Sequence, residues 1–345
     1  MKMLVKQSKP KTPTRATFVG LLFLIVIVLI AINPAKYSAV AFKGLEVWAK
    51  VLVPSLLPFF VLTKLLSATG TIDGVCTLFA PITTKFYKCP QKSSYVFFMS
   101  IITGYPVGSK LVADLYNSNQ ISKTDAIKMT SFCSTSGPMF ILGTVGIGMF
   151  ANAKIGYIIL LSHILGAITN GLFYRNIKQA NNTTLTNQPT QTKTNHTQST
   201  QKTITTNSFN FSQSIMASVE SLLLIGGVIC FTFVLLEVLT SNALFVSFAN
   251  LLNKCGLNAN LLTAIICGLG EITKGCLMLS STIVNSNIAC LICTFLISFG
   301  GIATFLQAYA FLKSVVPAKI FLLQKLTHAI CSTIICLILT TIITI

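Results

Sequence analysis

Apolar segments long enough to span a membrane recur along the whole chain, and this feature constrains the fold more than any other. We count nine of them. Each has roughly 20 residues, which matches a hydrocarbon core about 30 Å thick crossed by a helix. Hydrophobic residues make up 53% of the 345 residues and charged residues only 9%, so the chain has too little polar surface for a soluble globule. The sequence therefore predicts an all-α polytopic membrane protein.

The first apolar segment, residues 18–32, follows a basic N-terminal stretch and resembles a signal peptide in that respect. The sequence A-I-N-P after it is a poor cleavage site, however, and eight more apolar segments follow. We therefore interpret it as a retained transmembrane helix. Residues 1–44 are assigned to a cytoplasmic N-terminal tail and this first helix.

A polar tract at residues 176–211 interrupts the apolar pattern. It is rich in Thr, Asn and Gln, cannot bury a hydrophobic core, and is predicted to be a flexible linker. It separates two units, residues 45–175 and residues 212–345.

The two units resemble each other when one is shifted by about 165 residues onto the other. Three short matches occur in the same order: Ser55-Leu56-Leu57 with Ser221-Leu222-Leu223, I-I-T-G (101–104) with I-I-C-G (265–268), and Ser131-Phe132 with Ser298-Phe299. Each match alone is weak, but the near-constant offset indicates a duplicated unit.

Both units contain an interrupted apolar segment at the same place, G-Y-P-V-G-S-K (104–110) and G-L-G-E-I-T-K-G (268–275). Glycine and proline leave backbone groups that lipid cannot satisfy, so such backbone must be buried in protein or line a wet cavity. Paired breaks in two repeats point to the binding site of a transporter. The alternative is that each break is a kink that lets helices pack closely.

The distribution of Lys and Arg favours a specific topology. If segments 93–117 and 258–282 enter and leave the membrane on the same side, most basic loop residues lie on the cytoplasmic side. This arrangement gives about seven full spans and two re-entrant segments, puts the linker in the cytoplasm, and makes the two units inverted repeats. Nine full spans is the alternative. The net charge of +18 is spread singly over loops, so it does not indicate a nucleic-acid partner.

Four motifs carry a resemblance to a known family: S-I-I-T-G-Y-P-V-G-S-K (100–110), F-C-S-T-S-G-P-M-F-I-L-G-T-V-G (132–146), G-L-G-E-I-T-K-G (268–275) and S-F-G-G-I-A-T-F-L-Q (298–307). They resemble the YlbJ-type sporulation integral membrane proteins, also called SpoVV. These belong to a wider group with nucleoside-recognition Gate domains, related to concentrative nucleoside transporters. The resemblance covers about residues 45–340, so that 45–175 and 212–345 become two Gate-like repeats.

This resemblance implies a transporter of endospore-forming bacteria in the outer forespore membrane, carrying dipicolinic acid from the mother cell toward the spore. The chain departs from the family pattern at Ser134, where Asn is usual, and at Phe305, where His is frequent. Roles that need that amide or imidazole are therefore in doubt.

Dipicolinate is a flat dianion, so its site needs positive charge or paired donors. Lys110 and Lys274 occupy corresponding positions in the repeats and are candidates to face each other across a pseudo-two-fold axis. The alternative is local pairing of Lys110 with Asp114 and of Lys274 with Glu271. Glu271 itself is a candidate to accept a coupling proton or to hydrogen-bond the substrate, with structural pairing to Lys274 as its alternative.

The candidate substrate-binding residues are polar, charged or backbone-exposing residues of the four motifs. They are Gly104, Tyr105, Pro106, Gly108, Lys110, Ser134, Thr135, Ser136, Gly137, Pro138, Glu271, Thr273, Lys274, Gly300, Gly301 and Gln307. The small residues among them also suit helix packing. We interpret His163 and His328 as packing or hydrogen-bonding residues, and Glu237 as a residue that reaches toward the membrane interface.

The sequence contains no nucleotide-binding loop, metal-ligand cluster or catalytic motif, so neither an enzyme nor a cofactor is expected. The expected partners are a small anionic solute, a coupling ion that is either a proton or sodium, and the lipid bilayer. The oligomeric state stays open. A transporter of nucleosides or other small polar solutes and a non-transporting spore-envelope scaffold are the alternatives.

Overall fold

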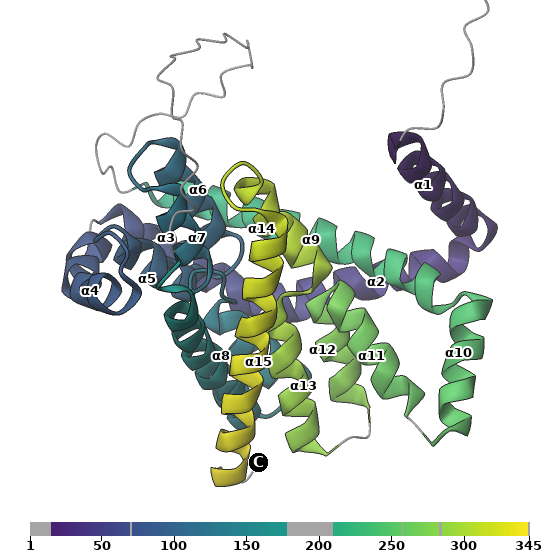
Figure 1. Ribbon diagram of the computed structural model, residues 1–345. Helices are drawn as coiled ribbons and strands as arrows, with labels where there is room; N and C mark the ends of the chain where they lie inside the picture. The colour runs from purple at the N-terminus through teal and green to yellow at the C-terminus, as the bar shows by residue number, and fades with distance from the viewer. Residues whose placement is uncertain (1–14, 70, 178–209, 257, 283–284, 344–345) are drawn as a thin grey trace, which may run out of the picture.

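The computed structural model describes residues 15–69, 71–177, 210–256, 258–282 and 285–343, and these contain helices and no strands (Figure 1). The polar tract 176–211 therefore lies almost entirely outside the described residues. In chain order the helices are α1 (Arg15–Ile32), α2 (Pro34–Val47), η1 (Trp48–Leu52), α3 (Val53–Ala68), α4 (Thr71–Tyr87), α5 (Ser93–Thr103), α6 (Val107–Asn117), α7 (Lys123–Thr130), η2 (Phe140–Met149), α8 (Ala153–Tyr174), α9 (Phe211–Thr240), α10 (Ala243–Lys254), α11 (Ala259–Gly270), α12 (Ile272–Ser281), α13 (Ser286–Phe299), α14 (Gly301–Leu312) and α15 (Ala318–Ile342).

Five helical stretches in the described part of the chain are long and apolar enough to cross a membrane: Pro34–Leu66, Ala153–Tyr174, Phe211–Thr240, Ser286–Leu312 and Ala318–Ile342. Shorter apolar helices, among them Val19–Ile32, accompany them. The predicted all-α class is confirmed. The count of about seven spans plus two re-entrant segments stays a prediction.

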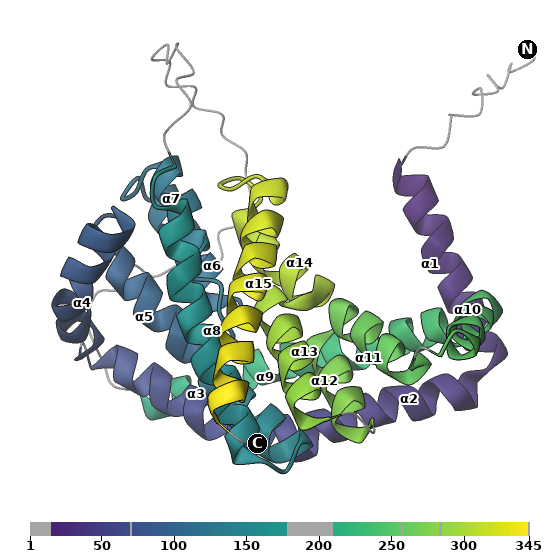
Figure 2. The ribbon, with the colours of Figure 1, turned by 60° about the horizontal axis from the view of Figure 1, so that its bottom comes forward.

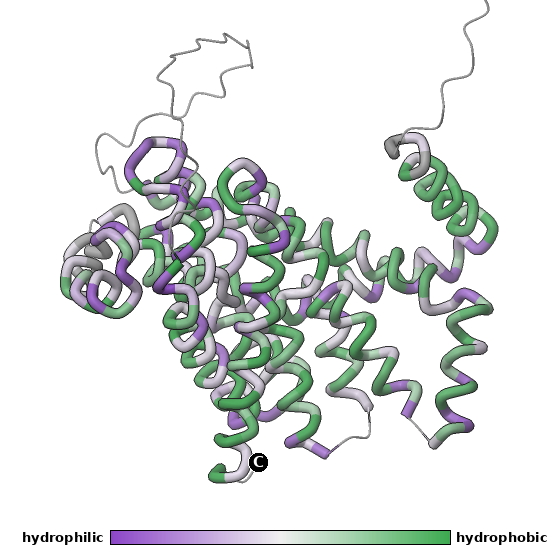
Figure 3. The backbone as a smooth tube through the Cα atoms, viewed as in Figure 1, coloured by the Kyte–Doolittle hydropathy of each residue, from purple (hydrophilic) through white to green (hydrophobic). Residues whose placement is uncertain are grey.

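The surface of the protein is strongly apolar. Hydrophobic residues run along most of α1, α10 and α15 (Figure 3), and many large side chains are exposed, such as Leu244 and Leu78. Contiguous apolar surface of this kind suits contact with lipid rather than water.

The same order of elements occurs twice in the chain. Each half contains a pair of short helices joined by a break, α5/α6 and α11/α12. A second interrupted helix follows each pair, α7/η2 and α13/α14, and then one long helix, α8 or α15. This order supports the duplicated unit that the sequence offset indicates.

The two long helices α8 and α15 pack against each other in opposite directions (Figure 2). Asn170, near the end of α8, donates a hydrogen bond to the backbone oxygen of Gln324, near the start of α15. Earlier in α8, Gly166 contacts Ser332, which lies later in α15. Equivalent helices that run in opposite directions are what two inverted repeats require.

The buried apolar clusters combine both halves. One joins Val112 and Phe132 of the first half to Leu312 and Phe321 of the second. Another joins Ile141 and Ile159 to Cys276, Leu296 and other residues of the second half. Each of these two clusters is therefore shared by the two halves.

Candidate functional site

The first break separates α5 from α6 at Gly104, Tyr105 and Pro106. Gly104 has φ +74°, a conformation that suits glycine, and a side chain there would collide with the backbone of Gly137. A side chain at Gly108 would likewise collide with the backbone oxygen of Cys133. The first break therefore packs directly against the non-helical segment between α7 and η2.

The second break separates α11 from α12 at Glu271, whose backbone is extended. The Glu271 carboxylate accepts a hydrogen bond of 2.7 Å from the backbone N–H of Lys274 and so caps α12. Gly301, with φ +63°, brings its backbone against the carbonyl oxygens of residues 268–270. Each break is thus supported by the interrupted helix that follows it.

A cavity of about 110 Å³ lies between the two breaks. Since one water molecule needs about 10 to 15 Å³ of cavity space, this cavity has room for several water molecules or a small solute. Its polar lining is drawn from both halves. It includes the predicted residues Tyr105, Ser136, Glu271, Thr273 and Gln307 together with Thr103 and Thr304, which were not predicted, and the predicted Gly137 also lines it.

Apolar side chains of α3 and α9, among them Leu56, Phe60 and Ile229, complete the cavity wall. An apolar cavity with a few converging polar groups is the usual form of a small-molecule site.

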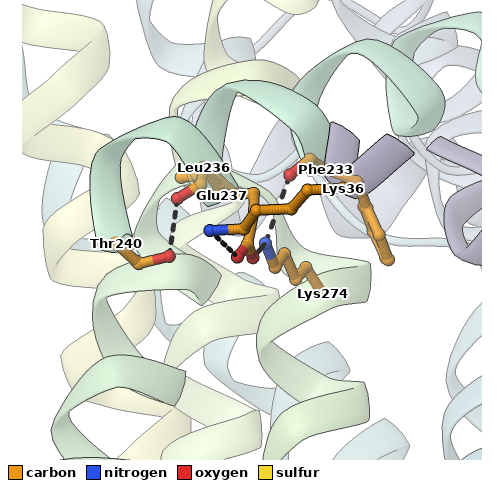
Figure 4. A network of polar contacts seen from close by, with 6 residues as sticks. All are labelled: Lys36, Phe233, Leu236, Glu237, Thr240 and Lys274. Atoms are coloured by element: carbon orange, nitrogen blue, oxygen red, sulfur yellow. Dashed lines mark hydrogen bonds and ion pairs between the residues drawn. The ribbon is translucent and has the colours of Figure 1, made fainter. Parts of the chain in front are cut away.

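Lys274 does not line this cavity. Its side chain is buried and reaches α9, where Nζ lies 3.2 Å from the backbone oxygen of Phe233 and 3.6 Å from a carboxylate oxygen of Glu237 (Figure 4). Glu237 also pairs with Lys36 of α2 at 3.3 Å. The alternative interpretation, an ion pair between the Lys274 ammonium group and the Glu271 side chain, is not what the structure shows, because the ammonium group lies beside Glu237. Nor does Glu237 act only as an interfacial residue, since it joins two lysines.

Lys110 is exposed on α6 and is not among the cavity-lining residues. The arrangement of Lys110 and Lys274 facing each other across the site is therefore not found, because one points to the surface and the other to α9. Among the described residues, the ion pairs within 4.0 Å do not include Lys110 with Asp114 either.

The S-T-S-G-P segment is held by hydrogen bonds rather than by helical structure. Thr135 donates through its hydroxyl to the backbone oxygen of Ser100 in α5, at 2.7 Å. The Ser136 N–H donates to Nε2 of His163 at 2.9 Å. Residues 134–137 are non-helical, and Pro138 begins the short helical stretch that leads into η2. The segment is thus tied to both α5 and α8.

His163 links the interrupted helices of the two halves. Because its Nε2 accepts from Ser136, Nδ1 carries the proton and donates to the hydroxyl of Ser298, at 2.8 Å. Sequence reasoning treated this residue as packing or hydrogen-bonding, which the geometry matches, but it did not foresee that two motifs meet there.

Lys325 is the residue that sequence reasoning missed. It is 2% exposed in α15, and its Nζ donates to the Tyr105 hydroxyl and, at 2.9 Å, to the backbone oxygen of Ser134. Nζ also lies 4.4 Å from the centre of the Tyr105 ring. The signal was a lysine within a long apolar helix, which is costly unless it has a function.

Known proteins with similar sequences support the resemblance that the four motifs indicate. The family model described as Gate, nucleoside recognition, matches residues 49–154. The chain is 28% identical over 320 residues to the sporulation integral membrane protein YlbJ of Bacillus subtilis (strain 168), an alignment that covers 89% of this chain and 78% of that protein. No solved structure matches. The resemblance indicated by the four motifs is confirmed, and it supports a multi-pass membrane protein.

Proposed function

We propose, from this similarity to a Gate-domain sporulation membrane protein, that the chain is a secondary transporter of a small anionic metabolite. The observation that carries the proposal is the cavity whose polar lining comes from both breaks and both interrupted helices. Broken helices that meet between inverted repeats form the substrate site in several transporter folds. A scaffold protein has no need for such a cavity.

Transport requires that the site open alternately to the two sides of the membrane. The cavity lies between the broken segments and the continuous helices α3 and α9. Movement of the broken segments against α3 and α9 would open the cavity first to one side of the membrane and then to the other. Glu271, which faces the cavity, is the proposed acceptor of the coupling ion, a proton or sodium.

The proposed substrate is dipicolinic acid, and the proposed location is the outer forespore membrane during sporulation. Both follow from the resemblance to the SpoVV-type proteins, and the relative's description as a sporulation membrane protein supports the setting.

The test is accumulation of labelled dipicolinate in vesicles that contain the purified protein, with proton and sodium gradients imposed separately. We expect uptake well above that of protein-free vesicles under at least one gradient. Uptake equal to that of protein-free vesicles under every gradient would contradict the proposal.

A nucleoside is the second candidate substrate, because the matching family model is described by nucleoside recognition. Competition separates the two candidates. Excess nucleoside should leave dipicolinate uptake unchanged if the anion is the substrate, and a nucleoside carrier should instead accumulate labelled nucleoside that dipicolinate does not displace.

A further inference from the structure

We propose that Lys325, Tyr105 and Ser134 form the point at which this protein binds a carboxylate group of its solute. The inference rests on the proposed transport function and specifies the chemical class of the substrate. It assigns the positive charge of the site to Lys325 of α15 in place of Lys110 and Lys274.

The first argument is the isolation of Lys325 from negative charge. The ion pairs within 4.0 Å in the described part of the chain involve Lys36, Lys50 and Lys274, and Lys325 is not among them. Lys325 is nevertheless 2% exposed. A buried cation without a counter-ion is expensive, whereas the buried Lys274 has Glu237 beside it. An anionic solute would supply the missing negative charge at Lys325.

The second argument comes from hydrogen-bond donors that have no acceptor. The ammonium group has three N–H donors, and two are used by the Tyr105 hydroxyl and the backbone oxygen of Ser134. The Tyr105 hydroxyl also donates its proton to the backbone oxygen of Ser134, at 2.7 Å. The Ser134 hydroxyl is buried and has no hydrogen-bond partner. One N–H of Lys325 and the Ser134 O–H are left, and a carboxylate offers acceptors to both.

The third argument is the position of this group beside the cavity. Tyr105 lines the cavity, and Lys325 contacts both the ring and the hydroxyl of Tyr105. Gly300, with φ +93°, gives Lys325 room, since a side chain at that position would come within 3.3 Å of Lys325 Cε.

Tyr105 covers Lys325 in this structure, so the carboxylate reaches the ammonium group only after the Tyr105 side chain moves. The rest of the solute then occupies the cavity.

The test compares purified Lys325→Gln and Lys325→Arg with Lys319→Gln, which changes an exposed lysine of the same helix. Dipicolinate affinity in detergent is measured by calorimetry, and folding by the thermal unfolding midpoint. Loss of a desolvated charge pair lowers affinity by about 30-fold or more, so we expect a loss of that size for Lys325→Gln. We expect partial retention for Lys325→Arg and wild-type affinity for Lys319→Gln. Wild-type affinity in folded Lys325→Gln protein would overturn the inference.

Ser134→Ala decides the matter even if Lys325→Gln does not fold. Because the Ser134 hydroxyl has no partner in the protein, its removal should leave the unfolding midpoint unchanged or raise it. If the hydroxyl binds the carboxylate, the same change lowers dipicolinate affinity several-fold. Unchanged affinity would contradict the inference.

Failure of the inference and failure of the transport function give different results. Uptake of a nucleoside but not of a dicarboxylate by the wild-type protein would support the transport function and contradict the carboxylate site at Lys325. Dipicolinate binding that depends on Lys325, without uptake into vesicles, would support the carboxylate site and contradict the transport function.

Discussion

His163 and His328 lie with their ring centroids 4.7 Å apart where α8 crosses α15, and they are separated by 165 residues in the chain. This separation is close to the offset of about 165 residues at which the two halves of the sequence match. Nε2 of His328 lies 3.1 Å from the backbone oxygen of His163. The contact joins positions that nearly correspond at this offset, and a pseudo-two-fold axis between inverted repeats is expected to pass near such a contact.

The two histidines should differ in their effect on stability. His163→Ala leaves the Ser136 N–H and the Ser298 hydroxyl without their partner, whereas His328→Ala removes a single contact to a backbone oxygen. A buried polar group left without its hydrogen-bond partner costs about 1 to 3 kcal/mol, so we expect the larger fall in unfolding midpoint for His163→Ala. Both changes remove the same volume, and an equal fall for the two would contradict the assigned role of His163.

Glu237→Gln should destabilise the protein by leaving Lys274 as a buried, unpaired cation. We expect a loss of roughly 1 to 3 kcal/mol in the free energy of unfolding, less than for a fully buried pair because the Glu237 side chain is 26% exposed. The double variant Glu237→Gln with Lys274→Met should recover part of the loss. Lys36→Gln is the control, because this half-exposed lysine should contribute less than 1 kcal/mol. A double variant no more stable than Glu237→Gln would contradict the pairing.

Gly104→Ala should prevent the first break from closing against the S-T-S-G-P segment. The substitution adds strain at φ +74° and a collision with the Gly137 backbone. We expect poor accumulation in the membrane or a strongly lowered unfolding midpoint. Gly227→Ala in α9 is the matched control, since nothing lies within 4 Å of the added carbon. That control should be neutral or stabilising by up to about 1 kcal/mol, and similar behaviour of the two variants would contradict the close packing.

Glu271→Gln should separate ion coupling from substrate binding. The amide oxygen can still accept the Lys274 N–H and cap α12, but the side chain can no longer carry a negative charge or take up a proton. We expect solute binding to persist while accumulation no longer responds to the ion gradient. Gradient-driven accumulation at the wild-type level would exclude Glu271 as the coupling residue.

The pattern of breaks was predictable because it depends on local chemistry. Glycine and proline at 104–108 and the G-L-G-E sequence at 268–271 interrupt their helices through local backbone chemistry, whatever the tertiary packing around them. The offset between the halves then paired the two breaks, and the structure brings Tyr105 and Glu271 of these breaks to one cavity. These predictions required no knowledge of helix rotation.

The partners of the lysines were not predictable in the same way. Lys274 pairs with a carboxylate on α9, and Lys325 contacts Tyr105, which is 220 residues away in the chain. Which side chains meet over such separations depends on how each helix is rotated and packed, and sequence spacing does not determine this. Spacing suggested Asp114 as a local partner of Lys110 and Glu271 as a local partner of Lys274. In the described part of the chain Lys274 pairs with Glu237 instead, and Lys110 is in none of the ion pairs within 4.0 Å.

The shared core has a consequence for biosynthesis. α15 supplies Lys325 to Tyr105, Gln324 to Thr130, and a packing surface to α8, yet the ribosome makes it after every other described helix. Until α15 enters the membrane, the Ser134 backbone oxygen has only the bond from Tyr105, and Asn170 has only its bond to Ser131. The first half also keeps its α15-facing surface open to lipid. The proposed carboxylate site, which needs Lys325, is therefore incomplete until insertion of α15.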